Sequence, residues 1–235
     1  MSVIKIDELR SSPQISIIIP ALNEEKTIAK TIDSVKDGFN VEVIVVDGGS
    51  SDKTVYEAKS AGAQIIKSQP PRSSQMNKGA EEAKGEILLF LHADTILPSG
   101  YELTVRGTLD YPEICAGAFR FKLDEESPSL SRIEKLANFR SEILKMPYGD
   151  QGIFLKKSLF DEVGGFPEMP IMEDFEFVRR VRKYGDIFTA PFPAITSARR
   201  WKERGVLKTT LINQLMIVGY YLGISPEKLR KWYNG

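Results

Sequence analysis

Short apolar runs that alternate with helical segments restrict the fold of this chain more than any other feature. Ile15–Ile19 is rich in β-branched residues and lacks polar alternation, which is typical of a strand buried on both faces. Further strands are predicted at Val41–Val46, Ala63–Lys67 and Glu86–Leu91, with helices at Glu24–Val35, Asp52–Ala61 and Ser73–Ala83 and an N-cap at Ser51 or Asp52. This alternation predicts a parallel sheet covered by helices and joined by right-handed crossovers.

The rhythm changes after about residue 110. Strands are predicted at Ile114–Phe121, Ile153–Leu155 and Asp186–Thr189, and helices at Leu130–Leu144, Phe175–Tyr184, Val206–Leu222 and Pro226–Tyr233. The apolar residues of 130–144 fit one helix face. With no repeat or linker, we expect one α/β domain over 1–235 with a mostly parallel central sheet. Its nucleotide-binding part covers about 14–110, its acceptor part about 111–203 and its C-terminal helices 204–235.

Composition excludes several classes of protein. Lys plus Arg and Asp plus Glu both number 32, which disfavours a protein dedicated to nucleic-acid binding. One Cys and one His rule out an intrachain disulfide and a zinc site with four Cys or His ligands. The first residues show no secretory signal, so we expect a cytoplasmic protein, with the inner face of a membrane as an alternative place.

The stretch Thr209–Pro226 is uncharged, but its apolar part, Leu215–Ile224, is shorter than the ~20 residues of a membrane span. We therefore expect a helix there that is buried or lies at an interface. Burial against the core is the default expectation, because amphipathic helices usually bury their apolar face. Homodimer formation and peripheral membrane contact are the alternatives.

Polar residues follow all four strands of the first part, where open parallel sheets bind their ligands. With the small residues beside them, the candidate residues at these strand ends are Pro20, Ala21, Asn23 and Glu24, then Asp47 and Gly48, then Arg72, and finally His92, Ala93 and Asp94. His92 and Asp94 are two residues apart at a strand end and so point the same way, which suits a divalent cation that also holds phosphates. The alternative is that Asp94 closes a turn or caps a helix near Pro98.

Three groups in the second part could carry chemistry. Glu173 and Asp174 begin a helix, where they either cap it or supply a general base. Tyr148, Asp150 and Gln151 lie in a Gly-flanked turn that is either plain or in contact with a ligand. Arg199, Arg200 and Trp201, with Lys202, form either a pyrophosphate clamp or a solvated basic turn with the indole packed on an Arg stem.

Three motifs are absent, and their absence disfavours three classes of protein. The loop after the second strand lacks both G-x-G-x-x-G and G-x-x-x-x-G-K-[ST], so a dinucleotide fold and a P-loop lose support. The chain also lacks G-x-S-x-G, so a hydrolase nucleophile elbow is not supported.

The order of these motifs resembles the family 2 glycosyltransferases of the GT-A fold. The resemblance rests on Ile17–Glu25, on Val45–Asp52, on His92-Ala93-Asp94 at the family's aspartate-x-aspartate position, and on Glu173-Asp174 at its catalytic acidic pair. It covers about residues 14–203.

A narrower group is also similar, namely the small soluble family 2 enzymes associated with radical-SAM genes and named for arsenosugar biosynthesis. The similar stretches are Arg72–Ala80, Leu89–Thr95, Tyr148–Gly152 and Thr196–Trp201. Two positions depart from the wider family. His92 replaces the first aspartate, and Ser197 stands where processive members have the Gln of Q-x-x-R-W. The lost Gln and the lack of membrane spans argue against polymer synthesis and export.

The resemblance implies inverting transfer of one sugar from a UDP- or GDP-linked donor to the hydroxyl of a small-molecule or lipid-linked acceptor. It implies donor binding by Pro20, Ala21, Asn23, Glu24, Asp47, Gly48, Arg72, His92, Ala93, Asp94, Arg199, Arg200 and Trp201. Asp94, with His92 as a further candidate, would hold Mg²⁺ or Mn²⁺, and the basic residues would lie on a flexible loop that closes over the donor. Asp174 would be the general base, with Glu173 or Asp150 next in line, and Tyr148, Asp150 and Gln151 would face the acceptor.

Two other function classes remain open on the sequence. A nucleotidyltransferase would use a similar sheet and acidic site, but the loop after the first strand is acidic and lacks a basic Gly-rich triphosphate cradle. A non-catalytic nucleotide-sugar binder would keep the donor site without turnover.

Overall fold

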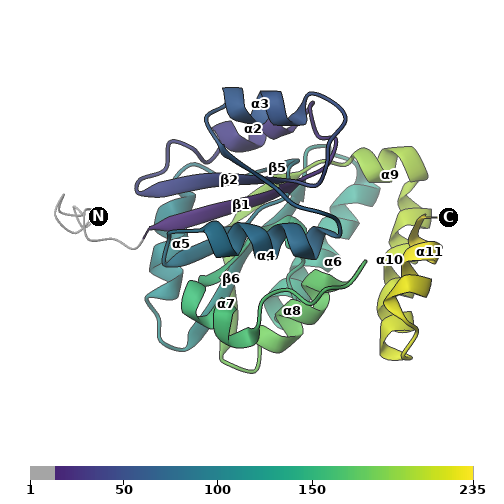
Figure 1. The fold of residues 1–235 in the computed structure, drawn as a ribbon. Helices are drawn as coiled ribbons and strands as arrows, with labels where there is room; N and C mark the ends of the chain where they lie inside the picture. The colour runs from purple at the N-terminus through teal and green to yellow at the C-terminus, as the bar shows by residue number, and fades with distance from the viewer. Residues whose placement is uncertain (1–13, 235) are drawn as a thin grey trace.

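The computed structural model describes residues 14–234, and its eight-stranded sheet has the order β3-β2-β1-β4-β7-β6-β8-β5. The parallel strands of its first part are β1 (Ile15–Ala21), β2 (Val41–Asp47), β3 (Gln64–Lys67) and β4 (Ile87–Phe90). They confirm the four strands predicted from the sequence. In Figure 1, β1 and β2 lie between α4 (Arg72–Glu82) on one side and α2 (Ile28–Asp33) with α3 (Thr54–Ser60) on the other.

The second part makes the sheet mixed. β7 (Ile153–Lys156) is antiparallel to both β4 and β6 (Ile114–Leu123), whereas β8 (Asp186–Thr196) is parallel to β6 and antiparallel to β5 (Thr95–Ile96). β8 extends well beyond its predicted end at Thr189. The prolines in this stretch argued against a strand, so the sequence did not predict the extension. The structure accommodates the prolines by a shift in register, since Phe119 pairs with Ala190 but Arg120 pairs with Pro193.

Side chains of β1 contribute alternately to two hydrophobic cores, because successive side chains of a strand point to opposite faces of the sheet. Ile17 and Ile19 pack in the core that includes α2, α3 and α5 (Tyr101–Leu109). Ile18 packs in the core that includes α4 and α8 (Glu173–Val181). A third cluster joins the end of β6 to α6 (Pro128–Ile143). Burial on both faces explains why the strand is almost continuously apolar.

Several predicted helix details are wrong. α2 begins at Ile28 rather than Glu24, and Lys53 is the N-cap of α3 in place of Ser51 or Asp52. Two helices of the second part were not predicted, α7 (Lys157–Val163) and α9 (Arg199–Arg204), whereas α5 in the first part begins close to the helix considered near Pro98. α9 also replaces the flexible loop expected there. Short helices of this kind leave too few turns for a clear apolar period.

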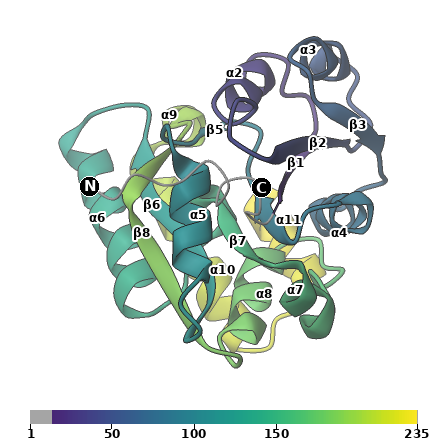
Figure 2. The same cartoon turned by 90° about the vertical axis from the view of Figure 1, so that its left-hand side faces the viewer.

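Two longer helices expose residues that were expected to be buried. On α6, Leu130 and Ala137 are buried but Leu136 and Ile143 are exposed, so the apolar residues of this helix do not form one buried face. α10 (Val206–Tyr221) and α11 (Pro226–Asn234) pack together at the right-hand side in Figure 1, and they lie behind the sheet in Figure 2. α10 buries Met216 but exposes other apolar residues. No helix within residues 14–234 combines the length and apolarity needed to cross a bilayer.

Candidate active site

The loops after β1 and β2 are tied together by hydrogen bonds. The backbone N–H of Asn23 donates to Ser50 Oγ at 2.9 Å, and the backbone N–H of Ser51 donates to Asn23 Oδ1 at 2.9 Å. The buried carboxylate of Asp47 accepts the backbone N–H groups of Gly49 and Ser50, each at 3.1 Å. Asp47 therefore shapes its own loop, which its place at the strand tip did not reveal.

Gln75 fastens the ends of these two strands, and sequence reasoning gave it no role. Its Nε2 donates to the backbone oxygens of Ala21 at 3.0 Å and Val46 at 2.9 Å. A Cβ added to Gly48 would lie 2.6 Å from this nitrogen, so the close approach requires glycine at that position. The only sequence signal was a glutamine on the buried side of a helix, which does not by itself identify a partner.

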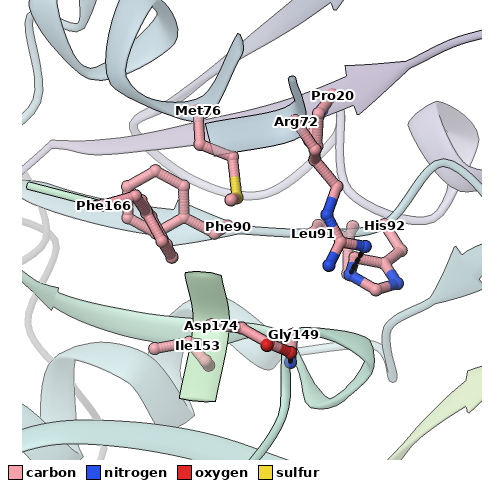
Figure 3. A pocket seen from close by; sticks show the side chains of 10 residues that line it. All are labelled: Pro20, Arg72, Met76, Phe90, Leu91, His92, Gly149, Ile153, Phe166 and Asp174. Atoms are coloured by element: carbon pink, nitrogen blue, oxygen red, sulfur yellow. Dashed lines mark hydrogen bonds between the residues drawn. The ribbon is translucent and has the colours of Figure 1, made fainter. Parts of the chain in front are cut away.

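Arg72 is the central side chain of a pocket at the carboxyl ends of β1 and β4 (Figure 3). Its Nε donates to Glu173 Oε1 at 2.7 Å, and its Nη1 lies 3.0 Å from His92 Nε2. Burial works against the charge of the guanidinium, but Glu173 and Asp174 outweigh it and raise the pKa of Arg72. The start of α4, the end of β4 and the start of α8 thus meet at one point.

His92 is neutral in this setting. Its burial, together with the charges of Arg72 and Arg200, lowers its pKa well below the ordinary histidine value. Because a guanidinium only donates, Nε2 accepts and the proton belongs on Nδ1. A Cβ added to Gly149 would lie 2.7 Å from Nε2, so this nitrogen is enclosed as well as bonded.

Asp174 lies across the pocket from Arg72 and His92, next to Gly149 (Figure 3). Its Oδ2 accepts the backbone N–H of Gly149 at 3.0 Å, and its Oδ1 accepts that of Phe175 at 2.7 Å. The two bonds fix the direction of the carboxylate while leaving it in contact with the pocket, as a positioned proton acceptor requires. The pocket is lined by Pro20, Arg72, Met76, Phe90, Leu91, His92, Gly149, Ile153, Phe166 and Asp174.

Asp150 is a second carboxylate near the pocket. Burial raises its pKa to about 6, opposed by Arg140 and helped by the charge of Asp174. Its buried Oδ1 has no hydrogen-bond partner in the part of the chain that the structure describes. Arg140 lies 3.3 Å from the centre of the Tyr148 ring, and its Nη2 donates to Gln151 Oε1 at 3.3 Å. The predicted acceptor residues therefore form one cluster beside Asp174.

Gln151 is fully buried and donates to the backbone oxygen of Phe119 at 2.9 Å. Gln151 therefore attaches the turn to β6, and its side chain is not open to a ligand. Burial raises the pKa of Tyr148 to about 12, which keeps its hydroxyl protonated. Of the three predicted acceptor residues, Tyr148 and Asp150 carry the polar atoms that still lack partners among residues 14–234.

Asp94 is the side chain best placed for a cation. It is half-buried, and burial together with the like charge of Glu24 raises its pKa, against the pull of Arg199. A carboxylate under these influences is stabilised by a cation. Residues 14–234 hold no cluster of three or more His, Cys, Asp or Glu side chains around one point. A single half-buried carboxylate of this kind fits an ion that takes other ligands from a diphosphate, as Mg²⁺ commonly does.

The basic segment near the C-terminus reaches the same loops. Arg199 Nη2 lies 2.9 Å from Glu24 Oε1, so α9 is tied to the loop after β1. Arg200 contacts the hydroxyl of Tyr233, while Lys202 pairs with Glu125. These bonds give α9 fixed partners, in contrast to the loop expected from the sequence.

Three residues predicted to bind the sugar donor instead stabilise the fold, two through their backbone oxygens and one through its packing in the core. The backbone oxygen of Ala21 accepts from Gln75, and that of Ala93 accepts from Thr31 Oγ1 at 3.0 Å. The Trp201 ring lies 6.1 Å from that of Phe121, in the third hydrophobic cluster. Trp201 therefore anchors α9 to β6.

The fold and the site together define an α/β protein whose polar residues gather beyond the carboxyl ends of parallel strands, around a carboxylate and a cluster of arginines. The family described as Glycosyl transferase family 2 matches residues 16–166, and the chain belongs to this family.

Curated relatives match part of the chain. A glucosyl-3-phosphoglycerate synthase from Mycolicibacterium paratuberculosis is 31% identical over 109 residues, which cover 41% of this chain and 33% of the relative. A probable glycosyltransferase from Bacillus subtilis is 23% identical over 207 residues, or 76% of this chain and 49% of the relative. These matches span between a third and a half of the relatives' length.

Solved structures agree in fold. A Pyrobaculum calidifontis mannosyltransferase in complex with GDP-Man and Mn²⁺ superposes with a TM-score of 0.67 at 18% identity, over 96% of this chain and 69% of that one. The Mycobacterium tuberculosis glucosyl-3-phosphoglycerate synthase in complex with Mg²⁺ and UDP gives 0.65 at 20% identity, over 92% and 84%. They confirm the expected GT-A type of α/β fold.

Proposed function

We propose that this chain is an inverting glycosyltransferase that moves one sugar from a UDP- or GDP-linked donor to an acceptor hydroxyl. The observation that carries the proposal is the meeting of Arg72, His92 and Asp174 in one pocket, although they come from three separate segments. Membership of family 2 supports the same chemistry. The relatives named for glucosyl or mannosyl transfer support a hexose as the sugar.

The donor nucleoside would lie on the joined loops after β1 and β2, against Pro20, Asn23 and Glu24. The hydrogen bonds between these loops support this placement because they fix the shape of the surface before a ligand arrives. Asp47 and Gly48 would hold that shape rather than contact the base. Arg72, Arg199 and Arg200 would face the diphosphate, since guanidinium groups match phosphate oxygens.

Asp94 would hold the divalent cation, Mg²⁺ or Mn²⁺, together with the donor's diphosphate. When bound, such an ion offsets the negative charge that builds on the leaving diphosphate. The bond between His92 Nε2 and Arg72 supports a different role for the histidine, which is to orient the guanidinium. A neutral imidazole serves this purpose without adding positive charge beside Arg72.

Asp174 would take the proton of the acceptor hydroxyl. As that oxygen bonds to the anomeric carbon, the bond from this carbon to the diphosphate oxygen breaks and the diphosphate leaves. Attack from the face opposite the leaving group inverts the anomeric centre. Glu173 would hold Arg72, and Tyr148 and Asp150 would contact the acceptor.

A thermal-shift panel with UDP, GDP, UDP-glucose, GDP-mannose and UTP, each with and without Mg²⁺ or Mn²⁺, tests the donor side. A ligand that binds only the folded chain raises its stability by RT ln(1 + [L]/Kd). We expect a metal-dependent shift with one diphosphate and its sugar, and loss of the metal dependence in Asp94→Ala. If none of these nucleotides shifts the melting temperature, the proposal that the chain binds a nucleotide-linked sugar is wrong.

Product analysis then separates the function classes. Release of a nucleoside diphosphate from the sugar donor supports transfer. Release of pyrophosphate from UTP and a sugar phosphate would show a nucleotidyltransferase instead. Tight binding of donor and metal without turnover, unchanged in Asp174→Asn, would show a non-catalytic binder.

The finer predictions from the sequence belong to the same proposal. Membership of the radical-SAM-associated subgroup is supported by the stretches Arg72–Ala80 and Tyr148–Gly152, which contribute Arg72, Gln75 and Asp150 to the site. A cytoplasmic location and one domain over 1–235 are further predictions, for which subcellular fractionation and limited proteolysis are the tests.

A further inference from the structure

One side of α10 is apolar and open to solvent. Apolar residues recur along it at intervals of three or four, so they lie on one side of the helix. They are Leu207, Leu211, Leu215 and Val218, followed by Leu222 at the C-cap. Leu207 is 86% exposed, Leu211 61% and Leu222 75%. Single exposed leucines are ordinary, but a stripe along a whole helix marks a contact surface.

Two helices in contact with α10 also expose apolar residues. On α11, which packs against α10, Trp232 is 53% exposed. α6, which also contacts α10, exposes Leu136, Phe139 and Ile143. We call the exposed apolar residues of α10 and α11 the C-terminal apolar face.

The charge around this face is strongly positive. Residues 199–235 contain eight Lys or Arg and two Asp or Glu, a net charge of +6 in a chain whose total is zero. Lys208 on α10 and Lys228, Arg230 and Lys231 on α11 are exposed. Four of the eight cations lie on α9, where Arg199 pairs with Glu24 and Lys202 with Glu125, so residues 206–234 themselves carry four Lys or Arg and one Glu, a net charge of +3.

We propose that the C-terminal apolar face binds the surface of an anionic phospholipid bilayer. Leucine side chains would enter the boundary between headgroups and acyl chains, Trp232 would lie at headgroup level, and the Lys and Arg side chains would contact lipid phosphates. A second copy of the chain is the less favourable occupant, because a symmetric contact would bring two such positive surfaces together.

The face also borders the proposed acceptor side. The ring of Tyr221 on α10 lies 5.7 Å from that of Phe175, whose backbone N–H donates to Asp174. A docked bilayer would therefore lie next to the groups that would receive an acceptor. This orientation rests on the proposed function, whereas the binding itself does not.

Co-sedimentation with sucrose-loaded vesicles tests the proposal on the whole chain without nucleotide. We expect binding to vesicles that are half phosphatidylglycerol, a fall in binding as salt is raised, and about tenfold weaker binding to pure phosphatidylcholine. The double variant Leu207→Ser/Leu211→Ser should bind at least about tenfold more weakly, since each leucine loses most of its transfer free energy.

Tyr56→Ser is the matched control. Tyr56 is 69% exposed but lies on α3, away from the C-terminal helices, so this variant should bind vesicles like the unaltered chain. Thermal unfolding of each variant checks that it is folded. Trp232 fluorescence should shift to the blue with anionic vesicles, and Trp232→Phe should abolish the shift.

Three results would overturn the proposal. They are absence of binding to anionic vesicles, unchanged binding by the double variant, and a dimer in light scattering that the double variant loses while vesicles remain unbound. The last result would assign the face to a second copy. Because the vesicle assay contains no donor, its failure is distinct from failure of the thermal-shift panel.

Discussion

Two regions of the molecule differ in how far their side chains are satisfied by contacts within the chain. They are the loops at the ends of β1 and β2 and the helices at the C-terminus. In the loops, polar groups bond to one another, as Asn23 does with Ser50 and Ser51. On α10, apolar groups such as Leu207 and Leu211 face water. The loops are therefore arranged before any ligand binds, whereas α10 retains surface whose burial would still be favourable.

The difference shows that polarity alone does not identify a binding surface. Polar residues that satisfy one another form a rigid support, and Asp47 and Gln75 serve in this way. Residues that lack a partner appropriate to their chemistry are the ones that await a ligand. Beside the pocket these include Asp150, and on the outside they include the C-terminal apolar face.

The largest expected effect comes from the pocket. Asp174→Asn keeps the shape of the side chain but removes the proton acceptor, so turnover should fall by ~10²–10⁴ while donor affinity is nearly unchanged. Steady-state kinetics and donor titration measure both quantities. Asp161→Asn, at an exposed position on α7, is the control. Full activity in Asp174→Asn would move the base to Glu173 or Asp150.

Gln75→Leu tests the rigid support. The change leaves the backbone oxygens of Ala21 and Val46 without their side-chain donor, which should lower the free energy of unfolding by about 1–3 kcal/mol. Urea denaturation measures the loss, and donor affinity should fall with it. The exposed Gln69 offers the control Gln69→Leu. Equal stability of the two variants would contradict the supporting role.

Asp150 predicts a dependence on pH. Its folded pKa of about 6 lies above the ordinary carboxyl value of 3.8, so the folded state binds the proton more tightly than the unfolded state. This contribution to stability is present below about pH 4 and is lost as pH rises through about 6. The variant Asp150→Asn has no titrating group at this position, so its stability does not decrease for this reason as pH rises.

The melting temperature of Asp150→Asn relative to the unaltered chain should therefore increase from pH 4 to pH 7. The difference between the two proteins cancels other groups that titrate in this range, such as Asp94, whose pKa is also raised. A constant difference across the range would show that Asp150 has no raised pKa in the folded chain.

The smallest effect is expected at the outside of α10. Leu207→Ser removes an apolar side chain that is 86% exposed, so the free energy of unfolding should change by no more than about 0.5 kcal/mol. Urea denaturation beside Gln75→Leu gives the comparison directly. A loss as large as that of the glutamine variant would mean that Leu207 is packed in the folded chain.

Patterns within short stretches predicted the first part of the fold well. β1, β2 and β4 were found because a strand buried on both faces requires a short, mainly apolar run, whatever surrounds it. The second part was predicted less well. β8 carries two prolines and a bulge, and α9 has six residues, so neither shows a clear period.

The site was predicted as a set of residue types but not as a set of contacts. Arg72, His92, Asp94 and Asp174 were all named from their positions after strands or at a helix start. Their partners were not predictable, because Arg72 and Glu173 are 101 residues apart and Glu24 and Arg199 are 175 apart. Gln75 was missed for the same reason.

What local spacing fixes in this chain is the series of strands and helices and the side of the sheet where polar residues collect. Those properties follow from the period of apolar residues, which requires no knowledge of distant segments. Packing alone determined that His92 bonds to Arg72, that Gln75 joins the ends of β1 and β2, and that α10 leaves its leucines outside. Each depends on which segments far apart in the sequence come into contact and exclude water there, and that is settled only when the whole chain has folded.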